Sequence, residues 1–132
     1  MKTDSLLTRG QLERKLSQEI QAFYRNHLGH QPSKVTCQLF DSKLAIIIED
    51  SITKAEKILL EEGKNELAKE VRSNLDDAMQ PELKKIIEQI INVSVLDTLS
   101  DATLDTKRTG IIAVLSQTPT VRNPESIPKL KK

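Results

Sequence analysis

The chain has 132 residues, of which 37% are hydrophobic and 30% charged, and its formal net charge is +1. This length fits one domain with one modest core. A net charge near zero creates no long-range field that would attract nucleic acid or an anionic membrane. Aromatic residues make up only 2% of the chain, too few for a surface on which bases stack. We therefore expect no nucleic-acid partner.

The location of the protein can be inferred from its cysteine content and its apolar runs. Cys37 is the single cysteine, so no intramolecular disulfide can form. The first ten residues lack the apolar region of a signal peptide. No apolar run approaches the roughly 20 residues that cross a membrane as a helix. These features predict a cytoplasmic protein without a membrane span of its own.

The first expected element is an amphipathic helix from about Thr8 to Leu28. Its apolar residues recur at helical spacing on one face: Leu12, Leu16, Ile20, Phe23 and Leu28. Gly29 provides a helix stop, and Pro32 prevents continuation.

Two runs with strand character follow, Val35–Phe40 and Lys43–Glu49, and Asp41-Ser42 between them predicts a tight hairpin. In the second run Leu44, Ile46 and Ile48 share one face, whereas Ala45 and Ile47 lie on the other. A strand that is apolar on both faces is typical of the inside of a sheet or of a subunit contact.

The middle of the chain predicts three helical segments. Thr53 and Glu56 form a capping box at the start of the first, and Gly63 ends or bends it. The second extends over 65–79 on a stripe of apolar residues. Pro81 fits the first turn of a third helix, which carries four isoleucines up to residue 91.

A second hairpin is expected from Val93–Asp101 and the short apolar run Ile111–Leu115, which resembles a central strand. From Gln117 onward, prolines recur among polar residues, so residues 117–132 predict an extended or flexible tail. Residues 1–116 then form a single α+β domain: a four-stranded antiparallel or mixed sheet of two hairpins covered by helices.

Catalytic chemistry has little support in the residues. His27 and His30 are separated by the helix-breaking Gly29, and zinc sites normally show four ligands or three plus water. Cys37 lies in mid-strand among apolar residues, as a buried core cysteine does. No Ser-His-Asp arrangement is evident. We expect no catalytic residue, no metal and no cofactor, and the leading hypothesis is that the chain is not an enzyme.

Four basic side chains are candidates for binding an anionic ligand: Lys34, Arg72, Lys107 and Arg108. Lys34 follows the helix-to-strand loop, and Lys107 and Arg108 lie at the second hairpin loop. Each can contact a phosphate or carboxylate. The alternative is that they belong to a solvated surface, where an exposed ion pair contributes at most roughly 1 kcal/mol.

Several short motifs are similar to a small bacterial family. They are Gly29-His30-Gln31-Pro32, the hairpin end Ile46 to Asp50, the run Ser51 to Leu59, and Glu70-Val71-Arg72, followed by an Asp-rich loop before an apolar strand. Over about Leu12 to Ser116 the chain resembles the DUF2294 family, also called MpsC-like. That resemblance implies an accessory or regulatory role beside a Na+-translocating, membrane-potential-generating system, and it supplies no catalytic residue.

These observations leave three functional hypotheses. The first is a binding or assembly module, a homodimer that also meets a protein partner, because the two-sided strands carry more apolar surface than one layer of helices covers. The second is a sensor of an anionic small molecule. The third is a small enzyme of unknown reaction.

Overall fold

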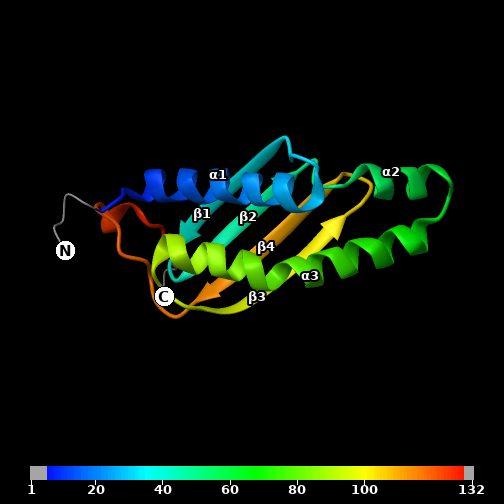
Figure 1. The fold of residues 1–132 in the computed structure, drawn as a ribbon. Coiled ribbons are helices and arrows are strands. Elements are labelled where there is room, and N and C mark those ends of the chain that lie inside the picture. Colours follow the sequence, from blue (N-terminus) through cyan, green and yellow to red (C-terminus); the bar gives the residue numbers. More distant parts are fainter. Residues whose placement is uncertain (1–5, 130–132) are drawn as a thin grey trace.

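The computed structural model describes residues 6–129, and Figure 1 shows their arrangement as one layer of helices on a four-stranded sheet. The elements in chain order are α1 (Arg9–Leu28), β1 (Lys34–Phe40), β2 (Lys43–Glu49), α2 (Lys54–Glu61), α3 (Asn65–Ile91), β3 (Val95–Thr103), β4 (Arg108–Leu115) and the short 3-10 helix η2 (Pro124–Ser126).

The sheet has the strand order β1-β2-β4-β3, and every neighbouring pair is antiparallel. The predicted α+β class, the two hairpins and the N-terminal helix are confirmed. β2 and β4, the two runs that are apolar on both faces, are the central strands. β3 extends two residues further than predicted, because Ala102 and Thr103 continue the ladder opposite Thr109 and Arg108.

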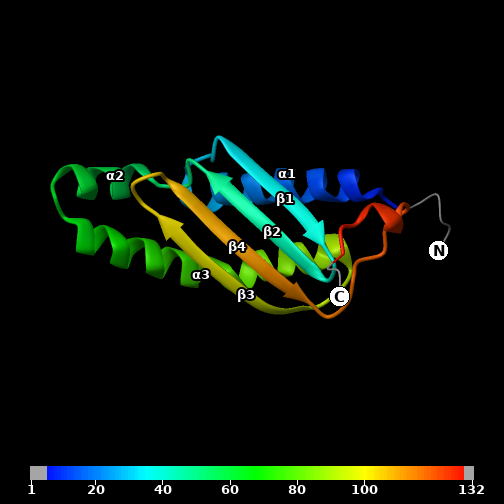
Figure 2. The same cartoon turned by 180° about the vertical axis from the view of Figure 1, so that it is seen from behind.

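Both long helices lie on the same face of the sheet, as the view from behind makes plain (Figure 2). This inner face of the sheet and the helices bury the core. From the two central strands it contains Leu44, Ile46, Ile48, Ile111, Ala113 and Leu115, and from the helices Leu12, Leu16, Ile20, Leu83, Ile87 and Ile91.

No described helix covers the opposite face of the sheet, which we call the outer face. The strand register places on it, from β1 to β3, the side chains of Thr36, Gln38, Phe40, Lys43, Ala45, Ile47, Glu49, Arg108, Ile112, Val114, Asp97, Leu99 and Asp101. Ile47 is 44% exposed and Leu99 58% exposed. The outer face therefore carries an apolar centre that the folded chain leaves open to solvent.

The middle of the chain differs from its prediction. The sequence predicts separate helices before and after Pro81, but α3 is one helix of 27 residues with Pro81 inside it. Proline lacks the N–H that would bond the carbonyl four residues earlier. The helix nevertheless continues, because Met79 and Leu83 on either side of the proline are buried against the sheet. The free energy gained by burying these side chains therefore outweighs the cost of placing proline inside the helix.

The segment after β4 also differs from the flexible tail that the sequence predicts. Its Val121 and Ile127 side chains are buried in the core. The Arg122 N–H donates to the carbonyl of Leu7 at 2.8 Å, and the Asp41 N–H donates to the carbonyl of Pro128 at 2.6 Å. Two apolar residues among the prolines thus anchor the segment across the end of the sheet. The last three residues of the predicted tail lie outside the described part of the chain.

We predict that Pro81→Ala stabilises the protein. The side chain of Pro81 is exposed, so its removal leaves no cavity. Alanine restores the helical N–H and removes the ring clash, whereas loss of proline also makes the unfolded chain more flexible. The net gain in the free energy of unfolding should be about 2 kcal/mol. Urea unfolding monitored by circular dichroism measures it. An unchanged or lower free energy of unfolding would contradict a strained Pro81.

Candidate functional site

The four basic side chains proposed as anion ligands lie in two different environments. Lys34 in β1 and Arg108 in β4 both pair in register with Glu49 in β2, at one end of the outer face. The Nε of Arg108 lies 3.2 Å from Oε1 of Glu49, in an exposed pair. Lys107 occupies the β3–β4 turn with a left-handed φ of 61°. Arg72, by contrast, is a buried residue of α3 and is only 4% exposed.

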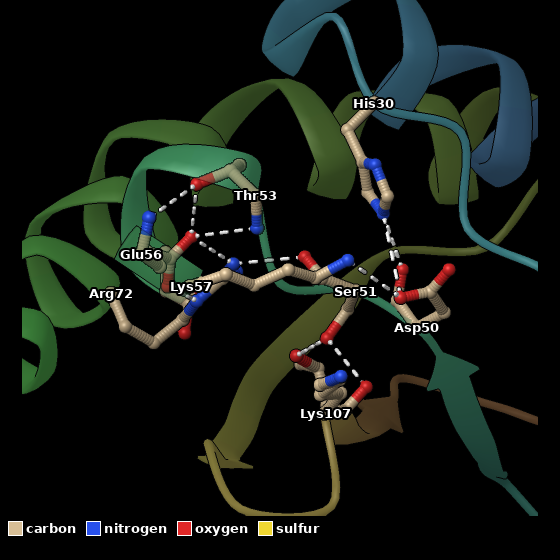
Figure 3. A network of polar contacts seen from close by, with 10 residues as sticks. His30, Asp50, Ser51, Thr53, Glu56, Lys57, Arg72 and Lys107 are labelled. Atoms are coloured by element: carbon tan, nitrogen blue, oxygen red, sulfur yellow. Dashed lines mark hydrogen bonds and ion pairs between the residues drawn. The ribbon is translucent and has the colours of Figure 1, made fainter. Parts of the chain in front are cut away.

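Arg72 is the centre of a buried ion network (Figure 3). Its Nε donates to Oε2 of Glu56 at 2.8 Å, and its Nη2 donates to Oε1 of Glu56 at 2.6 Å. The same Nη2 donates to the carbonyl oxygen of Ser51 at 2.9 Å, and Nη1 donates to Oδ1 of Asp76 at 3.2 Å. A bidentate pair of this kind is the strongest ion-pair geometry available to arginine.

Glu56 has two functions in this network. As the third residue of α2 it completes the capping box, because its Oε1 accepts from the N–H of Thr53 at 3.1 Å and from the Thr53 hydroxyl at 2.7 Å. Its carboxylate is fully buried, and it therefore requires the guanidinium as a counter-charge. This pair thereby joins the start of α2 to the N-terminal part of α3.

Ser51 connects the same network to the sheet. Its N–H donates to the carbonyl of Lys107 at 3.0 Å, and its hydroxyl lies 2.8 Å from that of Thr109. Since its carbonyl accepts from Arg72, one fully buried residue joins the β3–β4 turn to α3. Next to it, Nε2 of His30 lies 2.7 Å from the carbonyl oxygen of Asp50.

The electrostatics of the network differ between its two arginine partners. Burial by itself would lower the pKa of Arg72, but the hydrogen bonds and charges of Glu56 and Asp76 outweigh it and raise that pKa. Burial raises the pKa of Asp76, and the attraction of Arg72 offsets this only in part. The guanidinium is therefore permanently charged, whereas the Asp76 carboxylate is held in an unfavourable environment.

An open pocket of about 490 Å³ lies beside the network. One wall is α3 and the other is the end of β3 with the following turn. The lining residues are Lys69, Arg72, Ser73, Asp76, Asp77, Ser100, Asp101, Ala102, Thr103, Leu104 and Asp105. The volume falls in the range of small-molecule sites, about 300–1,000 Å³. Of the four predicted ligand residues, only Arg72 lines this pocket.

The sequence reasoning identified the capping box but not the pairing of Glu56 with Arg72. One feature of the sequence indicates that Arg72 is buried. It lies on the same helical stripe as the buried Ala68 and Met79, where an apolar residue is expected. A charged residue on a buried stripe requires a buried partner. The partner itself, 16 residues earlier in the chain, cannot be identified from spacing alone.

The histidines and the cysteine lie at separate places. Nδ1 of His27 is 3.0 Å from the carbonyl oxygen of Phe23 within α1, and His30 contacts the backbone of Asp50. Cys37 is buried in β1, and that burial raises the pKa of its thiol to about 11. A thiol with this pKa is a poor nucleophile near neutral pH.

The two carboxylates around Arg72 give a matched pair of variants. Glu56→Gln should lower the free energy of unfolding by about 3 kcal/mol, because it leaves a buried guanidinium without its bidentate partner. Asp76→Asn also removes one negative charge, but it should lower the free energy of unfolding by less than about 1 kcal/mol. The reason is that the unfavourable burial of the Asp76 carboxylate already offsets much of its attraction to Arg72. Urea unfolding of both variants measures the contrast, and equal losses would contradict it.

Acid titration of the same two proteins provides a second test. Because the pKa of Asp76 is raised in the folded state, the folded protein binds this proton more readily than the unfolded chain, between the ordinary pKa of 3.8 and the raised value. Lowering the pH through that window should therefore stabilise the wild type relative to Asp76→Asn. A stability difference that does not change with pH would be the contrary result.

The chain was compared with known proteins and families. The family model described as "Na+-translocating membrane potential-generating system (MpsC)" matches residues 8–117. Neither a curated protein nor a solved structure matches the chain significantly. Within residues 6–129, no helix is both long and apolar enough to cross a membrane. Since the family model covers most of the sequence, from the N-cap of α1 to just past β4, the chain belongs to the MpsC family.

Proposed function

We propose that the chain is a non-catalytic assembly module that forms a homodimer through the outer face of its sheet. The carrying observation is the apolar centre of that face, where Ile47 and Leu99 are 44% and 58% exposed beside Ala45, Ile112 and Val114. Soluble proteins seldom leave a contiguous apolar patch open without a partner. A flat face of this kind meets another sheet in the manner of a sandwich.

The charges around the apolar centre favour a second copy as the occupant. Along β2, Lys43 lies at one end and Glu49 at the other, with Ala45 and Ile47 between them. When a second β2 crosses this face in the opposite direction, Lys43 of each copy lies opposite Glu49 of the other. Self-complementarity of this kind is what a twofold interface requires.

The edges of the sheet are less suited to self-association. β3 is an edge strand, and its exposed Asp97 and Asp101 would approach their own copies if two β3 strands paired. Charges on an edge strand are a common obstacle to edge-to-edge pairing. Face-to-face packing is therefore the association that the charge pattern favours.

The size of the outer face sets the expected strength of the dimer. Four strands of this length present roughly 400 Å², whereas a standard stable interface buries roughly 800 Å² per partner. We therefore expect a reversible dimer that dissociates on dilution. The family description, a Na+-translocating membrane potential-generating system, supports an accessory or regulatory role for this dimer beside ion-carrying subunits.

Two substitutions at equally exposed leucine and isoleucine side chains test the interface. Ile47 on the outer face and Leu67 on α3 are each 44% exposed. Ile47→Glu places a charge in the apolar centre and should make the protein monomeric in sedimentation velocity at micromolar concentration. Leu67→Glu should leave the monomer–dimer equilibrium unchanged.

Circular dichroism of both variants controls for folding. If Ile47→Glu is folded and associates as the wild type does, the outer face is not the interface. Loss of the dimer in Leu67→Glu alone would place the contact on the helices and would also contradict the proposal.

A further inference from the structure

We propose that the pocket between α3 and the β3–β4 hairpin binds a small organic cation that carries an amine or guanidinium group. This inference is independent of the proposed dimer, because the pocket is lined by α3, the end of β3 and the β3–β4 turn rather than by the apolar centre of the outer face.

The first support is an unused acceptor on Asp76, whose side chain is 16% exposed and lines the pocket. Asp76 accepts from Arg72 through Oδ1, and its Oδ2 has no hydrogen-bond donor within residues 6–129. Both side chains line the pocket, so the remaining acceptor of Asp76 can be used by a molecule inside it.

The second support is the balance of charge. Four acidic residues line the pocket: Asp76, Asp77 and Asp105, and also Asp101, whose side chain the strand register places on the outer face. The cations of Lys69 and Arg72 oppose them. The charge of Arg72 is already offset by its bidentate contact with Glu56. The electrostatic potential in the pocket therefore favours a cation, because several carboxylates would repel an anion at once.

A bound cation would also relieve an unfavourable feature of the free protein. Burial raises the pKa of Asp76, which means that its charged form is insufficiently compensated. An ammonium or guanidinium group close to Oδ2 would supply that compensation and a hydrogen bond.

The arrangement suits an organic cation better than a bare metal ion. In the described part of the chain, no three His, Cys, Asp or Glu side chains converge closely enough to hold a metal. The hydroxyls of Ser73 and Ser100 instead add polar groups to the lining of a pocket of about 490 Å³, to which Ala102 and Leu104 contribute apolar groups. A short aliphatic chain with a cationic end matches this lining.

Isothermal titration calorimetry of the full chain with agmatine and with putrescine tests the proposal. At least one of the two should bind saturably with one site per chain, against a background of constant ionic strength. Asp77→Asn, which removes an exposed carboxylate of the pocket, should weaken that binding about threefold to tenfold. Glu70→Gln removes the same charge from α3 outside the pocket and should leave the affinity unchanged.

Three results would overturn the inference. They are the absence of saturable binding by either amine, equal weakening by Asp77→Asn and Glu70→Gln, and saturable binding of inorganic phosphate at the pocket in place of the amines. Circular dichroism of the two variants confirms that they are folded before they are titrated.

Discussion

α1 and α3 cover the same face of the four-stranded sheet. This one-sided covering determines which residues of the sheet form the core and which remain exposed to solvent. The inner residues of β2 and β4 are buried under the helices, which supplies the core that a chain of this size needs. On the outer face, the central residues of the same strands, Ala45, Ile47, Ile112 and Val114, are apolar although no described helix reaches them. An arrangement that buries one face leaves the other open to solvent, and the apolar centre of that open face is the basis of the proposed interface.

The buried pair between Arg72 and Glu56 holds the remaining elements in place. α2 is short, and Glu56 is its one fully buried residue, whereas Leu59 and Leu60 are half-buried. The bidentate contact ties α2 to α3, and the contacts of Ser51 tie both to the β3–β4 turn (Figure 3). The same network forms the floor of the pocket, because Arg72 and Asp76 belong to both. The residues that line the proposed ligand pocket are thus different from those of the apolar centre of the outer face.

Much of the fold could be predicted from local patterns. The spacing of apolar residues indicates α1 and the two hairpins, and the capping box marks the start of α2. Three features could not be predicted, because each depends on contacts distant in sequence. α3 continues through Pro81 because buried residues on both sides hold it against the sheet, and the segment after β4 is ordered by two apolar anchors. The pairing of Glu56 with Arg72 requires the helices to be placed first. The pocket combines residues of two elements that are 23 or more positions apart, from Asp77 to Ser100, so the sequence offers no local signal for it.

The central claim is that the outer face meets a second copy of itself, and small-angle X-ray scattering of the wild-type chain tests it most directly. Over a series of concentrations, the account predicts a scattering mass that rises from that of the 14.9 kDa chain towards twice this value. The maximum dimension should stay close to that of one chain, because the two sheets stack. A mass of one chain at every concentration would contradict the account, and so would an elongated dimer joined along its sheet edges.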